Sequence, residues 1–163
     1  MMNTEPKYTF LLTLCTEYLT QLGSPTSCLT SYEITSSDPE LHDEDYQRAL
    51  QNTKCNLKND RKPGVCKPYL VSSIMLVNEP LDTNETKNLY VYRMRFHIVY
   101  YRNYSDYPKT TNKEIDIEST NRVLTRQEFD NAVEFIRGKI SDLGCVHQIE
   151  TPFLVSWIRT LKE

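Results

Sequence analysis

Residues 90–101 read YVYRMRFHIVYY, and this stretch decides the fold of the chain. Successive side chains of a β-strand point to opposite faces, so every second residue shares a face. The set expected to face a core is apolar or aromatic at each position: Tyr90, Tyr92, Met94, Phe96, Ile98 and Tyr100. The other set carries Arg93, Arg95 and His97. The pattern therefore predicts a strand with one face on a core.

Further strands are expected around this one. The runs 29–34, 69–77 and 114–117 are rich in residues that favour strands. A polar spacer of hairpin size, residues 81–88, joins the run 69–77 to the strand 90–101, and a proline-bearing turn containing Tyr107 and Pro108 follows that strand. These connections predict strands that follow one another as an antiparallel meander.

Helical spacing is expected at both ends of the chain. Over residues 7–21, apolar residues such as Phe10, Leu14 and Tyr18 recur at helical intervals. Residues 125–128 read TRQE, a capping box that opens a helix running to Gly144. Residues 151–152 read TP and repeat the start signal before an apolar stripe over 153–161. Because helices and strands are segregated along the chain, the class is α+β: an antiparallel meander sheet with helices packed on one face.

A polar stretch over about residues 35–67 lies between the first two predicted strands. It begins acidic and turns basic, and its only helical pattern lies at Tyr46 to Leu50. Connections of this length are functional loops or disordered segments. The sequence therefore predicts one domain over 1–163 with an inserted polar loop at about 35–67.

This order of elements resembles the RWD domain family, and most of all the amino-terminal RWD domain of the general-control kinase of amino-acid starvation. The resemblance is carried by residues 89–96, 107–108, 114–117, 143–145 and 153–158. The family's turn motif places a second proline after Tyr-Pro and three further residues, where this chain has Asn112. The resemblance implies a sheet like that of ubiquitin-conjugating enzymes and a role in docking partner proteins, with translation-control regulators as the best-known example.

Catalytic chemistry finds no support in the sequence. Conjugating enzymes place a nucleophilic cysteine after the Tyr-Pro turn, preceded by His-Pro-Asn, and neither occurs between Pro108 and Gly144. The four glycines are scattered, and the three histidines lack metal-ligand spacing. We therefore expect no catalytic residue, no cofactor and no metal.

The charge and the cysteine content limit the classes of partner and the cellular compartment that we expect. The net charge of −3 gives no global attraction to nucleic acid or to an anionic membrane, and no run approaches the roughly 20 apolar residues of a membrane span. Five widely spaced cysteines without a C-x-x-C pair are typical of reduced thiols. We expect a cytoplasmic or nuclear protein that binds neither nucleic acid nor membrane.

The expected partner is another protein. Arg93, Arg95 and His97 on the polar face of the strand, with Tyr104 and Tyr107 near the turn, are the aromatic and arginine residues that interfaces favour. The ordinary interpretation of each is a solvated strand or turn residue. Three other functions stay open: an inactive conjugating-enzyme variant, a ubiquitin-pathway adaptor, or a structural subunit of a larger complex such as a kinetochore assembly.

Overall fold

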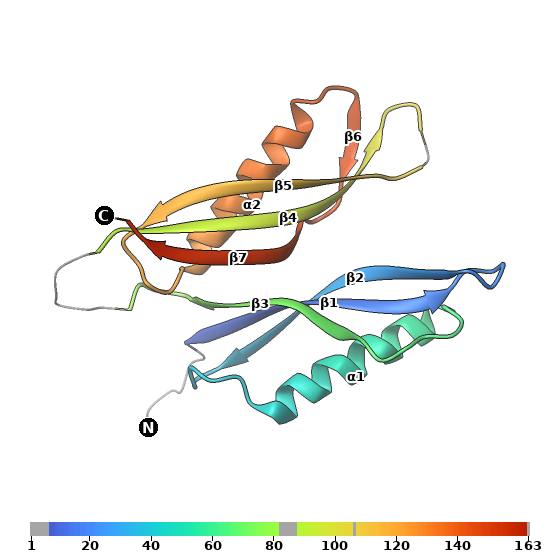
Figure 1. The fold of residues 1–163 in the computed structure, drawn as a ribbon, viewed down its shortest axis with the longest axis horizontal. Helices are drawn as coiled ribbons and strands as arrows, with labels where there is room; N and C mark the ends of the chain where they lie inside the picture. The colour runs from blue at the N-terminus through green and yellow to red at the C-terminus, as the bar shows by residue number, and fades with distance from the viewer. Residues whose placement is uncertain (1–6, 82–87, 106, 163) are drawn as a thin grey trace. The chain divides into compact units, whose positions relative to one another are not determined.

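A computed structural model describes residues 7–81, 88–105 and 107–162 of the chain. These residues form seven β-strands and two α-helices, which confirms the α+β class (Figure 1). No helix among them is long and apolar enough to cross a membrane. The sequence predicted one domain over 1–163; the described residues group into two compact units, the first ending at Met75 and the second beginning at Leu76.

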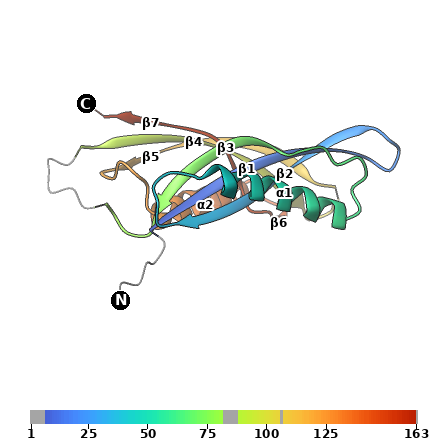
Figure 2. The same ribbon diagram turned by 90° about the horizontal axis from the view of Figure 1, so that it is seen from below.

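The first unit has a three-stranded sheet with β1 at its centre. Strand β2 pairs antiparallel with β1 along the whole length of both strands, from Tyr8 opposite Ser36 to Leu19 opposite Pro25. On the other side of β1 lies β3, whose last two residues belong to the second unit. Helix α1 runs along this sheet in both views (Figures 1 and 2). The elements are β1 (Tyr8–Leu19), β2 (Pro25–Ser36), α1 (Asp43–Asn59) and β3 (Tyr69–Val77).

The helix predicted over residues 7–21 is wrong, because this segment forms β1. Phe10, Leu12 and Leu14 point to one face of the strand and pack with Ala49 and Leu50 of α1. Apolar residues fill so many positions of this segment that its pattern fits a helical period and a strand period equally well. Antiparallel pairing with β2 selects the strand.

The loop predicted over residues 35–67 is also wrong in its larger part, because α1 occupies 43–59. The buried face of this helix consists of Ala49, Leu50, Thr53 and Leu57. Two of these four residues are small or polar, so the apolar stripe of the helix is faint in the sequence. Burial against the sheet stabilises this helix, although its sequence has only a weak helical periodicity.

The second unit repeats a central strand with partners on both sides. Strand β5 pairs antiparallel with β4 on one side, from Tyr90 opposite Ser119 to Tyr100 opposite Lys109. On the other side, β6 pairs with the end of β4 and β7 with its first part, both antiparallel. The elements are β4 (Tyr90–Arg102), β5 (Lys109–Ser119), α2 (Arg126–Ser141), β6 (Val146–Ile149) and β7 (Phe153–Leu161).

The core of the second unit confirms the alternation predicted for β4. Every second residue from Tyr92 to Tyr100 is buried, and Phe96 lies 6.1 Å from the ring of Phe129 on α2, centroid to centroid. The predicted capping box is present: the Thr125 side chain accepts from the Glu128 backbone, and the Glu128 side chain accepts from the Thr125 backbone. The strand and helix that decide this unit are therefore predictable from sequence.

The helix predicted over residues 153–161 is wrong, because this segment is β7. Its residues include Phe153, Val155, Trp157, Ile158 and Thr160, all of which favour strands. Pairing with β4 brings a bulge opposite Arg95 and Phe96. This contact between segments far apart in the chain overrides the local start signal at residues 151–152.

Candidate protein-binding face

The face of the second sheet that points away from its core places side chains from three strands in register. On β4, Arg93 lies opposite Asp116 of β5 and Ile158 of β7. One step along the same face, Arg95 lies opposite Glu114 of β5 and Ser156 of β7. We call this surface the outer face of the second unit. Two of the predicted site residues thus lie side by side on it.

Arg93 is held by carboxylates of β5. Its Nε lies 2.9 Å from Asp116 Oδ1 and its Nη2 lies 3.1 Å from Asp116 Oδ2, a two-pronged contact. The Glu114 carboxylate lies 3.6 Å from the same Nε. The hydrogen bond to Arg93 lowers the pKa of Asp116, and the same hydrogen bond raises the pKa of Arg93. The charge of Arg93 is therefore engaged within the sheet.

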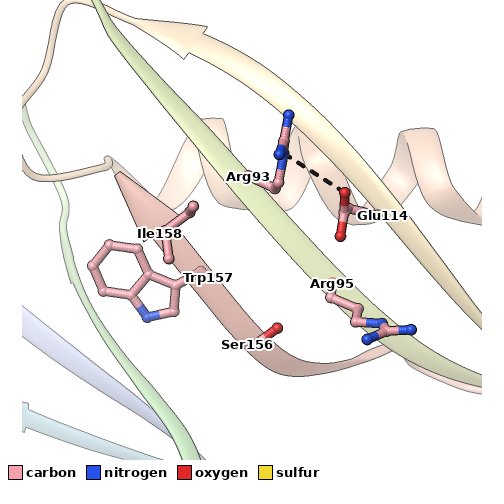
Figure 3. A pocket seen from close by; sticks show the side chains of 6 residues that line it. All are labelled: Arg93, Arg95, Glu114, Ser156, Trp157 and Ile158. Carbon is pink, nitrogen blue, oxygen red and sulfur yellow. Dashed lines mark ion pairs between the residues drawn. The ribbon is translucent and has the colours of Figure 1, made fainter. Parts of the chain in front are cut away.

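Arg95 differs from Arg93. It lies opposite Glu114 in the strand register, yet Glu114 forms its ion pair diagonally with Arg93. Figure 3 shows the Arg95 guanidinium pointing away from Glu114. The Arg95 side chain forms no hydrogen bond or ion pair with any residue in the described part of the chain. Its charge is presented to whatever approaches the outer face.

A shallow open groove of about 150 Å³ crosses this face (Figure 3). Ile158 contributes an apolar side chain that is 56% exposed. The Trp157 ring points to the other side of the sheet, where Trp157 lies opposite the buried Met94 and stacks on Tyr92 with the ring centroids 6.2 Å apart. The groove thus combines the exposed Ile158 with a guanidinium that no carboxylate among the described residues engages. We call it the Arg95 groove, and its lining consists of Arg93, Arg95, Glu114, Ser156, Trp157 and Ile158.

The structure separates the other predicted site residues from this groove. His97 lies two residues beyond Arg95 on the same face, with its Nδ1 3.0 Å from Asn112 Oδ1. Asn112, which stands at the last position of the turn motif, belongs to β5 and lies opposite His97. Neither residue lines the Arg95 groove.

Tyr107 and Pro108 lie between β4 and β5, as the sequence predicted. Tyr104 and Tyr107 are 97% and 79% exposed at this connection, beyond the end of β4. They are not among the lining residues of the Arg95 groove. The structure therefore brings together the arginines of the predicted site but not its tyrosines.

The cysteine side chains lie outside the Arg95 groove. Cys145 is exposed in the connection after α2, at φ 58°, and its backbone carbonyl accepts a hydrogen bond from the Asn103 backbone at 2.6 Å. Among the residues that the structure describes, no group of three or more His, Cys, Asp or Glu side chains is placed to hold a metal ion.

Sequence reasoning missed the β7 side of the groove. Ser156, Trp157 and Ile158 were expected on a helix, so their place beside β4 could not be anticipated. The strand-favouring composition of residues 153–161 is the signal that could have found them. Glu114 was expected in a strand, but its pairing with Arg93 depends on the register between β4 and β5.

Comparison of the chain with known proteins yields no relative. No protein-family model matches it, and neither a curated protein nor a solved structure matches it.

Proposed function

We propose that the chain is a non-catalytic protein-binding module whose Arg95 groove binds an acidic segment of a partner protein. One observation carries the proposal: Arg95 presents a guanidinium that no described carboxylate engages, next to the exposed Ile158. Arginine binds carboxylates through two parallel hydrogen bonds, and it is enriched among the residues that dominate binding energy. The groove is suited to a carboxylate beside an apolar side chain.

The charges around the groove define how such a segment lies. Along β5, the outer face carries the carboxylates of Glu114, Asp116 and Glu118. These carboxylates repel an acidic segment that lies along β5. On the β7 side the outer face carries Ser156 and Ile158, which are uncharged. An acidic segment therefore approaches over β7, with its carboxylate at Arg95 and an apolar residue against Ile158.

The RWD resemblance supports the same role through one part of the chain. Strand β4, the Tyr107–Pro108 connection, β5 and α2 follow one another in the order that the resemblance implies. Residues 7–21 and 153–161, helices in that resemblance, are strands. The absence of a cysteine between Pro108 and Gly144 supports a role without thioester chemistry. The proposal rests on the surface more than on the family.

Selection from a displayed library of random peptides tests the proposal. The full chain is the bait, and the same selection is run with Arg95→Gln. A matched control is Arg102→Gln, because Arg102 is an exposed arginine of the same strand outside the groove. We expect the wild type and Arg102→Gln to enrich peptides that pair Asp or Glu with an apolar residue. Arg95→Gln should lose this enrichment.

Two results contradict the proposal in different ways. Enrichment of acidic peptides that survives Arg95→Gln would show that the module binds peptides elsewhere. A reducible adduct with ubiquitin, formed with its activating enzyme and ATP and lost in Cys145→Ser, would show that the chain is a catalyst.

A further inference from the structure

One end of the first unit is rich in cations. Lys58 lies in the last turn of α1, and residues 61–78 contain Arg61, Lys62 and Lys67 but no acidic residue. The neighbouring residues 18–32, which contain the connection between β1 and β2, carry no charge at all. This distribution is local, since the whole chain has a net charge of −3.

Backbone contacts hold the connection after α1 beside the end of β1. The Leu19 backbone N–H donates to the Pro63 carbonyl at 2.8 Å. The Nζ of Lys62 lies 5.1 Å from the centre of the Tyr18 ring, a cation–π contact. The connection after α1 and the end of β1 therefore form one surface.

The β1–β2 connection presents a leucine to solvent in a fixed turn. Leu22 is 95% exposed. The turn around it is closed by hydrogen bonds from the Thr20 backbone N–H to the Ser24 carbonyl at 2.8 Å and from the Gly23 backbone N–H to the Thr20 carbonyl at 2.9 Å. In both views this connection projects beyond the end of α1 (Figures 1 and 2). An apolar side chain is thus held at a convex tip.

Arg61 occupies a backbone position that favours glycine. It follows α1 at φ 61°, and the neighbouring Lys62 backbone N–H donates to the Leu57 carbonyl at 3.1 Å, as at a helix end closed by a left-handed residue. Residues other than glycine adopt this conformation only rarely. Arg61 lies two residues before Pro63, whose carbonyl accepts a hydrogen bond from the Leu19 backbone N–H at the end of β1.

We propose that this end of the first unit docks on an anionic membrane surface. Leu22 enters the lipid interface while the cations contact the head groups, so apolar insertion and charge attraction act together. The four cations outnumber Glu17 and Asp60, the acidic residues that directly precede these segments. A convex tip with an exposed leucine fits a deformable lipid surface better than a nucleic acid or a folded protein. We define the tip patch as Leu19, Leu22, Lys58, Arg61, Lys62 and Lys67.

This proposal is independent of the Arg95 groove. It also replaces, for one end of the chain, the expectation that net charge excludes membrane binding. The test is co-sedimentation of the full chain with phosphatidylcholine vesicles that contain or lack phosphatidylserine. We expect binding only to the vesicles with phosphatidylserine, and binding that weakens as the salt concentration rises.

Arg61→Gly separates binding from folding. Glycine suits φ 61°, so the variant should unfold at an equal or higher urea concentration than the wild type. It should nevertheless bind anionic vesicles about fivefold more weakly, the effect of one cation near the membrane. Leu22→Ser should weaken binding about tenfold, through the loss of an inserted apolar side chain.

Leu143→Ser and Arg102→Gln are the matched controls, because they change an exposed leucine and an exposed arginine of the second unit. Both should bind as the wild type does. Absence of binding to anionic vesicles overturns the proposal, as does equal binding to vesicles without phosphatidylserine. Equal losses in Leu22→Ser and Leu143→Ser, or unchanged binding in Arg61→Gly, would also overturn it.

Discussion

The two units of the chain have the same order of elements but different central strands. In each unit the first strand lies at the centre of the sheet, the second strand pairs on one side, and the chain returns after the helix on the other side. The returning segment is interrupted in both units. In the first unit it pairs with β1 through Pro63 and Cys66, and β3 follows. In the second unit it pairs with β4 through β6 and then through β7.

The central strands differ in what their two faces carry. β1 is buried on both faces, with threonines such as Thr9 and Thr13 on one face and leucines such as Leu12 and Leu14 on the other. β4 alternates between a buried apolar face and an outer face with exposed arginines. Charged residues at alternate positions of β4 therefore predict both the strand and which of its faces is exposed. The absence of such charges on β1 hides the strand.

The largest expected effects come from the buried faces of both central strands. Phe96 is fully buried, so Phe96→Ala should destabilise the protein by about 3–5 kcal/mol through lost burial and cavity formation. Leu12 on β1 is also fully buried, so Leu12→Ala should destabilise the protein by about 2–5 kcal/mol. Urea unfolding monitored by circular dichroism measures both. A cost below 1 kcal/mol in Leu12→Ala would show that β1 is not the centre of its unit.

A smaller difference is expected between two glycines at the start of the returning segments. Gly144 has φ 78° and open space around an added Cβ, so Gly144→Ala should cost only the left-handed conformation, about 1–2 kcal/mol. Gly64 has φ 64°, and an added Cβ would lie 2.8 Å from the Leu19 side chain. Gly64→Ala should therefore cost more than Gly144→Ala in the same urea experiment. The reverse order would contradict the packing of Gly64 against β1.

The two helices should differ at their amino-terminal caps. Thr125→Ala removes a side chain that accepts from the Glu128 backbone, which should cost about 1 kcal/mol. His42 stands at the same position of α1 but makes no hydrogen bond from its side chain to the helix backbone. His42→Ala should therefore change the free energy of unfolding less than Thr125→Ala does. Thermal unfolding of both variants at neutral pH decides this.

Acid should weaken the second unit through the same cap. Partial burial raises the pKa of Glu128, but hydrogen bonds from Ser119 and Thr125 outweigh it and hold the pKa below its usual value of 4.5. A carboxyl group with a lowered folded-state pKa contributes stability above the unfolded pKa and loses it as pH falls through the folded pKa. In Glu128→Gln the loss of stability below about pH 4.5 should be smaller than in the wild type.

The readout for this pH dependence is the fluorescence of Trp157, the single tryptophan, which stacks on Tyr92. Unfolding by urea is compared at neutral pH and at pH values below 4.5. Equal acid sensitivity of the wild type and Glu128→Gln would contradict the role of this carboxylate.

Sequence alone predicts the parts of the fold in which local signals agree. The alternation of β4, the strand over 69–77 and the capping box at Thr125 are all present in the structure. Residues 7–21 and 153–161 were predicted wrongly because their apolar residues fit two periods. Pairing with the neighbouring β2 in the first case and with the distant β4 in the second selected the strand. Helix α1 was missed because Ala49 and Thr53 form half of its buried face.

The candidate site was predictable to the same degree. Alternation along β4 placed Arg93 and Arg95 on the outer face. Which arginine forms an ion pair was not predictable, because it depends on the strand register. Glu114 pairs diagonally with Arg93, and no other carboxylate in the described part of the chain engages Arg95. The apolar side of the groove comes from β7, which only the tertiary pairing brings next to β4.

The most direct test of the account measures binding and stability on the same Arg95→Gln protein. The ligand is the acidic peptide that the wild type enriches most strongly, and its Kd is measured by calorimetry. Arg95 is exposed and outside the core, so we expect the free energy of unfolding to change by no more than about 0.5 kcal/mol. The Kd should rise at least about tenfold, as for a residue that dominates an interface, and Arg102→Gln should leave it unchanged. An unchanged Kd in Arg95→Gln would contradict the claim that the Arg95 groove is the binding site.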